Sequence, residues 1–448
     1  MTYNDFDPQQ TQQELTTVVE TILAEAKSKG ADNAEVVTSI DAGYSVNVRL
    51  GEVDTVEYHR DKGVGITVYY GQRKGSASTV DTTPQALAQA VEKACYIAKH
   101  TAEDPFAGLA DKSQMAFDYP ELSLYHPWSL STEDAIEFAK QCEALGLAQD
   151  ERVTNSDGVD VSTNQGVHVY GNSHGFIGVE PITRHSFSCC LVAKDGDNMQ
   201  RDYDYTVARD PDELLSLEQV AKTAADKAVN KLNGRQVKTG EFPVIFHHRI
   251  ASGLLRHFFA AIKGSSLYRE ASFLLGQLGK PVFPDHIQID ERPHLLKGLG
   301  SSPYDSDGVM TRAKHFIKDG MLASYLLGTY GARKLGMAST GNAGGAYNVF
   351  INTSDKDLSA LIKDMGTGFL VTDVMGQGIN IVTGDYSRGA NGFWVENGEI
   401  QFPVEEVTIA GNLKDMYRNI VTVANDIDKR STIVTGSILI DSMMLAGE

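Results

Sequence analysis

Hydrophobic and polar residues alternate regularly near the start of the chain. Between residues 44 and 50, Tyr, Val, Val and Leu alternate with polar residues, the period of a strand with one buried face. Residues 53–58 and 65–70 predict antiparallel partner strands, joined by a turn at 61–63, where the sequence is Asp-Lys-Gly. The pattern therefore predicts an antiparallel sheet in this part of the chain.

Helical segments flank these strands. Residues 12–29 predict a helix that Gly30 ends, and Thr83 precedes a second helix that has proline at the favoured first position. Apolar residues recur along one stripe of this second helix, as expected for a helix that packs on a sheet. We therefore predict one α+β unit over residues 1–115.

A second unit of the same kind follows. Residues 111–127 contain prolines, aromatics and acids without periodicity, which indicates a linker. Ser131 is a predicted N-cap of a helix, and residues 155–205 predict several short strands. An apolar face on residues 217–232 predicts a closing helix. These elements define a second α+β unit over residues 125–236.

Beyond residue 239 the pattern changes to strands with few helices. Asp319-Gly320 and Asn397-Gly398 predict tight hairpins, and residues 413–426 predict one of the few helices. Glycines crowd the rest, as in strands that bend. The predicted fold class is α+β, with helices on a mainly antiparallel sheet followed by a β-rich, partly barrel-like domain over residues 239–448.

Composition narrows the function classes. The chain has 448 residues, 42% of them hydrophobic and 22% charged, as in a globular protein of two or three domains. Its net charge of −19 argues against broad binding to nucleic acid or to an anionic membrane face. No apolar run approaches the ~18 residues that span a bilayer.

Cysteine usage and the N-terminus predict the compartment. The four cysteines form no C-x-x-C pair, and three of them lie in apolar or helical contexts, where a free cysteine behaves as a small hydrophobe. The first residues have neither a basic start nor an apolar core, so no secretory signal is predicted. We therefore expect a cytoplasmic protein.

Two motifs suggest chemistry that their context does not support. Residues 171–175, Gly-Asn-Ser-His-Gly, match the nucleophile elbow of α/β-hydrolases, but the following glycine and proline exclude the helix that the elbow requires. A glycine-rich hairpin turn is predicted instead. Asp195, Asp197, Asp202 and Asp204 lack the spacing of a calcium loop, so a solvated acidic hairpin is predicted.

The most informative stretch is residues 242–280. A hydrolytic zinc needs about three N, O or S side chains and a nearby carboxylate that takes a proton. This segment offers His257, but it is followed by Phe258, and Ile262 stands one turn later. Neither of these apolar residues can bind a metal or move a proton. His248 lies nine residues from His257, on the opposite face of one helix at about 100° per residue.

The frame of this segment resembles the zinc-site segment of the PmbA/TldD family, also known as peptidase U62 and as "modulator of DNA gyrase". In the catalytic branch of that family a small-residue run leads into His-Glu-x-x-x-His. Here residues 252–256 lead into His257, while Phe258 and Ile262 occupy the glutamate and second-histidine positions. This pattern is that of the PmbA (TldE) branch. The resemblance rests on the segments 339–345, 375–380, 384–390 and 392–400, covers essentially the whole chain and is specific over residues 340–415.

The resemblance implies a function and partners. It implies a subunit of a cytoplasmic metalloprotease complex that cleaves unstructured peptides, such as peptide-antibiotic precursors. This chain lacks the zinc motif, so no catalytic residue, metal or cofactor is expected in it, and zinc is expected in a TldD-like partner. The chain is expected to form a homodimer when alone and to bind neither nucleic acid nor membrane directly.

Glycine-rich strand segments near residue 344 could admit an extended peptide by strand addition, because they carry no blocking side chains. The predicted substrate-binding residues are Asn342, Gly344, Gly345 and Asn348.

Two other functions stay open at this point. One is a stand-alone metallopeptidase that uses ligands scattered in sequence, such as His174, His247 and His257. The other is a regulatory protein that modulates DNA gyrase.

Overall fold

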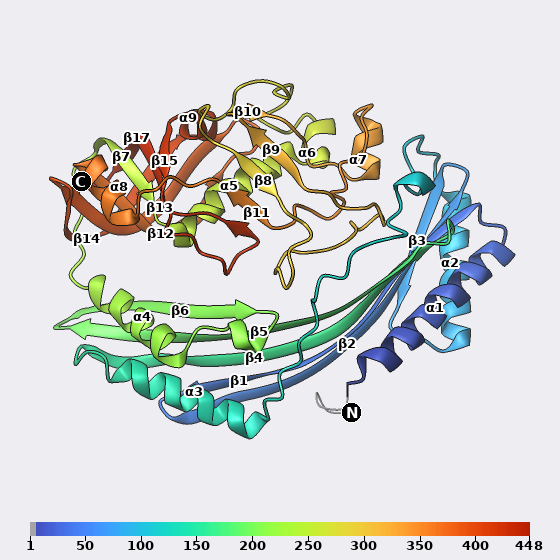
Figure 1. The fold of residues 1–448 in the computed structure, drawn as a ribbon, viewed down its shortest axis with the longest axis horizontal. Helices are drawn as coiled ribbons and strands as arrows, with labels where there is room; N and C mark the ends of the chain where they lie inside the picture. The colour runs from blue at the N-terminus through green and yellow to red at the C-terminus, as the bar shows by residue number, and fades with distance from the viewer. Residues whose placement is uncertain (1–5) are drawn as a thin grey trace.

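Six long strands form one antiparallel sheet in the first half of the chain (Figure 1). The computed structural model describes residues 6–448. The strand order is β3-β2-β1-β4-β5-β6, and every neighbouring pair is antiparallel. The strands are β1 (Asn33–Arg49), β2 (Glu52–Tyr70), β3 (Arg73–Thr79), β4 (Val153–Asn172), β5 (Ile177–Asp195) and β6 (Asn198–Ala208).

Two pairs of helices cover one face of this sheet, one pair near each end (Figure 1). They are α1 (Pro8–Ser28), α2 (Pro84–His100), α3 (Thr132–Leu147) and α4 (Leu217–Asn230). The predicted caps are confirmed, since Thr83 accepts a hydrogen bond from the Ala86 amide and Ser131 from the Asp134 amide. Each helix pair buries its own apolar core against the sheet. Because the central strands are long, they contribute side chains to both cores.

Two predictions about these strands were wrong, because the strands are longer than the sequence pattern indicated. Residues 61–63 lie inside β2 rather than in a turn, and residues 155–205 form three long strands rather than several short ones. In β2 the stretch 52–62 is exposed on both faces, so its side chains show no alternation that could mark a strand. The predicted hairpin turn at residues 171–175 is confirmed, and the predicted acidic hairpin turns between β5 and β6 at Gly196, which has positive φ.

A closed, barrel-like sheet dominates the second half of the chain. Its order is β14-β13-β12-β7-β17, and pairing of β14 with β17 closes it, while β15 extends it from β17. The strands are β7 (Gly240–Phe246), β12 (Gly368–Ile379), β13 (Asp385–Glu396), β14 (Glu399–Asn412), β15 (Ile420–Val423) and β17 (Ile438–Ala446). The hairpin predicted at Asn397-Gly398 is confirmed, and both residues have positive φ.

A smaller sheet and short helices complete this domain. The sheet has the order β10-β9-β8-β11-β16, made by β8 (Ile289–Glu291), β9 (Lys314–Lys318), β10 (Met321–Leu322), β11 (Val349–Ile351) and β16 (Ile433–Val434). The helices are α5 (His248–Ile262), α6 (Gly264–Tyr268), α7 (Thr329–Lys334), α8 (Leu358–Met365) and α9 (Leu413–Arg418). The helix predicted over 413–426 was therefore too long, because residues 420–423 pair as β15.

Buried ion pairs join the two halves. The prediction of a solvated acidic hairpin was wrong for Asp202 and Asp204, which are each only 3% exposed. Asp202 contacts Arg249 of α5 at 2.7 Å, and Asp204 contacts Arg430 at 3.2 Å. Since both acids lie on β6, the first pair holds the start of α5 to the N-terminal sheet and the second holds the segment before β16 to it.

The predicted fold class is confirmed, with helices on an antiparallel sheet followed by a barrel-like domain. The division into units 1–115, 125–236 and 239–448 stays a prediction. None of the helices formed by residues 6–448 combines the length and the apolar character needed to cross a bilayer.

Candidate functional site

The segment that resembles the zinc-site segment of the family forms α5, a helix with a strongly apolar face. Buried residues recur along it with helical spacing: Ala251, Leu254, Leu255, Phe258, Phe259, Ala261 and Ile262. His247 caps its start, and the ring Nδ1 accepts a hydrogen bond from the Arg249 amide at 3.3 Å. Burial, together with the adjacent His248, lowers the pKa of His247 to about 3, so its ring is neutral and able to accept.

Phe258 and Ile262 lie on the core side of α5. Both are fully buried. The Phe258 ring contacts those of Phe283 and Tyr417, with centroids 5.4 and 6.1 Å away, and the Tyr417 hydroxyl donates to the Leu254 carbonyl at 2.9 Å. Phe258 and Ile262 are therefore packed core side chains.

His257 lies on a different side of the helix and is half-buried. Its ring stands 6.1 Å from that of Tyr386. Burial lowers the pKa of His257, and the nearby Arg388 and Arg256 lower it further. The ring is therefore neutral at pH 7, the state in which histidine binds metals, but it is one residue rather than a site.

The other histidines considered as ligands are dispersed. His174 lies in the turn between β4 and β5, where Nε2 is 3.1 Å from the Ala110 carbonyl, and His247 caps α5. Within residues 6–448, no group of three or more His, Cys, Asp or Glu side chains is placed to hold a metal ion. The structure therefore does not bring His174, His247 and His257 together.

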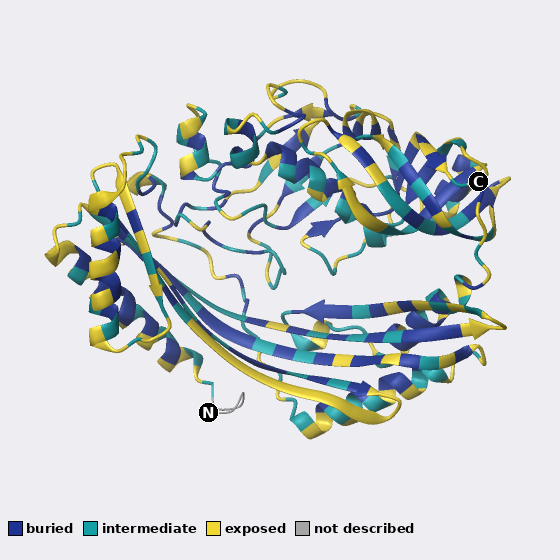
Figure 2. Cartoon of the chain, turned by 180° about the vertical axis from the view of Figure 1, so that it is seen from behind, coloured by how far each residue is buried: buried dark blue, intermediate teal, exposed yellow. Residues whose placement is uncertain are grey.

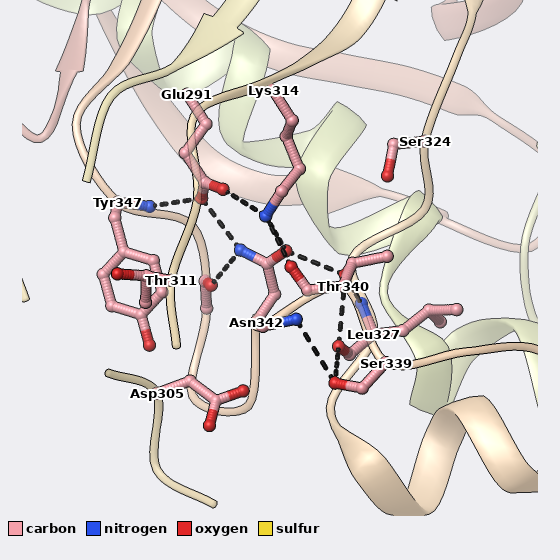
Figure 3. A network of polar contacts seen from close by, with 12 residues as sticks. Glu291, Asp305, Thr311, Lys314, Ser324, Leu327, Ser339, Thr340, Asn342 and Tyr347 are labelled. Carbon is pink, nitrogen blue, oxygen red and sulfur yellow. Dashed lines mark hydrogen bonds and ion pairs between the residues drawn. The ribbon is translucent and has the colours of Figure 1, made fainter. Parts of the chain in front are cut away.

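A buried polar network holds the segment that contains the predicted substrate residues (Figure 3). Glu291 accepts from Asn342 Nδ2 at 2.8 Å, from the Tyr347 amide at 2.7 Å and from Lys314 Nζ at 2.7 Å. Lys314 also donates to the Thr340 carbonyl and to Asn342 Oδ1. Burial raises the pKa of Glu291, and the contact with Lys314 opposes that rise.

Asn348 has a similar role in positioning the backbone. Its side chain donates to the Arg292 carbonyl at 3.1 Å and to Ser301 Oγ at 2.6 Å, and it accepts from the Gly300 amide at 2.9 Å. Asn342 and Asn348 are only 3% and 4% exposed. Both therefore fix the loop from inside.

The expectation of a strand at 341–345 was wrong, because these residues form a loop. Gly344 has φ of +102°, and a Cβ there would approach Ser306 Oγ to 2.6 Å. Gly345 has φ of +150° with open space beside it. Their conformations require glycine whether or not a peptide binds, so substrate binding by Asn342, Gly344, Gly345 and Asn348 stays a prediction.

Asp305 lies beside this loop and carries a shifted pKa. It accepts from the amides of Asp307, Val309 and Ala343 at 2.9, 3.0 and 2.9 Å. Burial, aided by the negative charge of Asp307, raises the pKa of Asp305 to about 7. The charge of this carboxyl group, which accepts a hydrogen bond from the loop at Ala343, therefore changes near neutral pH.

Asp305→Asn is expected to flatten the pH dependence of stability. Because the folded-state pKa is above the ordinary 3.8, the stability that Asp305 contributes is present below that value and is lost as pH rises through about 7. Melting temperatures of both proteins, measured from about pH 4.5 to about pH 8, should fall more steeply for the wild type. Parallel curves for the two proteins would show that Asp305 does not titrate in this range.

Family profiles identify the protein's relatives. Three profiles, described as PmbA/TldA metallopeptidase domain 1, central domain and C-terminal domain, match residues 34–98, 125–232 and 239–447. The chain belongs to the PmbA/TldD metallopeptidase family. Membership in the family confirms the resemblance noted in the sequence.

Individual relatives agree with this assignment. The chain is 50% identical over 434 residues to "Metalloprotease PmbA" of Escherichia coli O157:H7, covering 97% of this chain and 96% of that one. It is 49% identical over 437 residues to "Metalloprotease PmbA homolog" of Haemophilus influenzae, covering 97% of each. At this identity and coverage the whole chain, not one domain, is shared with these family members.

Solved structures show the same fold. A putative modulator of DNA gyrase from Bacteroides thetaiotaomicron has a TM-score of 0.92 and 27% identity, covering 97% of this chain and 99% of that one. TldE from Thermococcus kodakarensis has a TM-score of 0.81 at 21% identity, covering 96% of this chain and all of that one. The latter likeness shows the fold alone.

Several charged residues of this site were not found from sequence. Glu291, Asp305 and Lys314 lie within one stretch of 24 residues, but no motif or periodicity links them. One signal was available for Glu291, which follows Ile289 and Asp290 in a short strand that alternates buried and less buried positions. Alternation places Glu291 on the buried face, where a carboxylate needs a partner.

Proposed function

We propose that this chain is the non-catalytic subunit of a cytoplasmic metalloprotease complex that cleaves unstructured peptides. A TldD-like partner carries the zinc, and this chain supports it and helps to hold the substrate. When expressed without that partner, the chain forms a homodimer.

The observation that carries the proposal is the packing of α5. Phe258 and Ile262, which the resemblance places at the glutamate and second-histidine positions of the zinc motif, are both fully buried. A protein that keeps the family fold but fills these positions with core side chains has a function that does not need its own zinc. Support of a metal-bearing relative is such a function.

The unpaired edge of β2 supports the need for a partner. Residues 52–62 pair with β1 on one side, while β3 pairs only with residues 64–70. All of the stretch 52–62 is exposed, and it includes Val53, Val56 and Tyr58 (Figure 2). Long exposed edges with apolar side chains favour pairing with another chain.

A role in direct binding of nucleic acid receives no support from charge. The net charge of −19 opposes contact with phosphates, and the description as a modulator of DNA gyrase belongs to the Bacteroides protein. The proposal therefore concerns peptides rather than DNA.

The test is co-purification of the full-length, affinity-tagged chain from the cell that produces it. We expect a second family member to co-purify in equal amount, to bring zinc with it, and to make the preparation cleave an unstructured peptide. Recovery of this chain without any family member, with zinc and activity of its own, would contradict the proposal.

The β2 edge provides a matched pair of variants. Val56→Lys places a charge on the exposed edge, so it is expected to reduce recovery of the partner about tenfold or more if the partner pairs there. Val382→Lys is the control, because Val382 is also exposed but lies in the turn between β12 and β13. Equal loss of the partner in both variants would show that the partner does not pair with the β2 edge.

A further inference from the structure

A cavity lies between the N-terminal sheet and the first turns of α5. Its volume is 490 Å³. Arg184 of β5 and Tyr205 of β6 line it from the sheet, and Arg249, Gly253 and Arg256 line it from α5. This volume is in the range of pockets that hold small molecules or one or two peptide residues.

The cavity has excess positive charge. Two of its arginines are neutralised, Arg249 by Asp202 at 2.7 Å and Arg430 by Asp428 at 2.9 Å. Arg184 and Arg256 are exposed, and within residues 6–448 neither forms an ion pair. In a chain of net charge −19, two uncompensated guanidinium groups at one cavity provide a local site for an anion.

Gly253 supports binding in the same cavity. Glycine is among the least favourable residues inside a helix, so its presence in the second turn of α5 calls for a reason. A Cβ at Gly253 would meet no neighbouring atom within 4 Å, so close packing does not require glycine. The space above Gly253 is the cavity itself, and glycine keeps it open.

The positive charge comes from side chains rather than from the end of the helix. The first amides of α5 are already bonded, His248 N to Ser437 Oγ at 2.9 Å and Arg249 N to His247 Nδ1 at 3.3 Å. Guanidinium groups bind carboxylates through paired hydrogen bonds, which gives both charge and geometry.

We propose that this cavity binds carboxylate groups of an unstructured peptide through Arg184 and Arg256, with Gly253 leaving room for the peptide backbone. The inference rests on the proposed function only in taking a peptide as the ligand. The carboxylate comes either from the peptide C-terminus or from Asp and Glu side chains.

The probes are three short peptides of glycine, serine and alanine that carry the same uncharged fluorophore: one with a free C-terminal carboxylate, one amidated, and one amidated with two internal glutamates. Anisotropy with the purified full-length chain is expected to show about tenfold tighter binding of at least one carboxylate peptide than of the amidated neutral one. Which carboxylate peptide binds more tightly identifies the source. Equal binding of all three overturns the proposal.

Variants connect that preference to the cavity. Arg184→Gln/Arg256→Gln is expected to abolish it, whereas Lys194→Gln, which removes one positive charge from the exposed end of β5, is expected to keep it. Gly253→Leu should weaken binding of the preferred peptide about tenfold by filling the cavity, while Gly253→Ala retains the fold and checks that a side chain is tolerated on the helix. A preference that survives the double substitution, or wild-type binding by Gly253→Leu, overturns the proposal.

Failure here is distinguishable from failure of the proposed function. Binding is measured on this chain alone and needs neither partner nor proteolysis. A carboxylate preference without a co-purifying partner would support the cavity and contradict the complex. Co-purification of a zinc-bearing partner, without a preference for carboxylate peptides, would support the complex and contradict the cavity proposal.

Discussion

The double substitution Phe258→Glu/Ile262→His, which would create a His-Glu-x-x-x-His sequence in α5, is expected to unfold the C-terminal domain and not to bind zinc. Replacing a fully buried phenylalanine by a small or polar residue costs about 3–5 kcal/mol, and burying an unpaired carboxylate adds several more. Total stability of a domain is only about 5–15 kcal/mol, so the loss is comparable with the whole.

The measurement combines urea unfolding with zinc analysis after dialysis against the metal. His257→Ala is the matched control on the same helix, since His257 is only half-buried and makes one distant ring contact. We expect this variant to unfold near the wild-type urea concentration and to leave the proteolysis of the complex largely intact. A folded double variant that holds one zinc ion would contradict the description of α5 as a core helix.

Lys314→Met is expected to destabilise the protein by about 3–5 kcal/mol, because it removes one partner of a buried ion pair. Glu291 has a fully buried side chain and would lose its counter-charge. The Thr340 carbonyl and Asn342 Oδ1 would each lose a donor as well. The segment with the predicted substrate residues should therefore lose its order first.

Chemical unfolding of two further variants identifies the cause. Lys318→Met lies on the same strand, β9, but is exposed, and it should change stability little. Glu291→Gln/Lys314→Met should recover part of the loss, because an amide needs no counter-charge. Equal destabilisation by the two lysine variants would contradict the role of the buried pair.

The deficit of Lys314→Met should also depend on pH. Burial already raises the pKa of Glu291 above 4.5, and loss of Lys314 removes an influence that lowers it. Since a raised folded-state pKa means stability that is lost as pH rises through it, the deficit should grow from acidic to neutral pH. A deficit that is constant with pH would show that Glu291 stays ionised throughout.

Local signals in the sequence predicted most helices and tight turns. Thr83 and Ser131 cap helices as expected, and Asn397-Gly398 forms its hairpin, because each of these outcomes depends on neighbouring backbone groups.

Features that depend on distant residues were missed. Asp202 and Asp204 were predicted to be solvated, but Arg249 and Arg430, which lie far along the chain, cover and neutralise them. The β2 stretch 52–62 was divided by a predicted turn, because a strand exposed on both faces has no alternation. The cavity beside Arg184 is lined by residues of β5 and α5, which are distant in the chain, so no local pattern could indicate it.

The most direct test of the central claim is metal analysis and peptide cleavage of this chain alone, of the TldD-like relative alone, and of the two together. We predict no stoichiometric zinc and no cleavage by this chain, zinc in the relative, and cleavage of an unstructured peptide when the two are combined. One zinc ion per chain, with cleavage by this chain alone, would contradict the account.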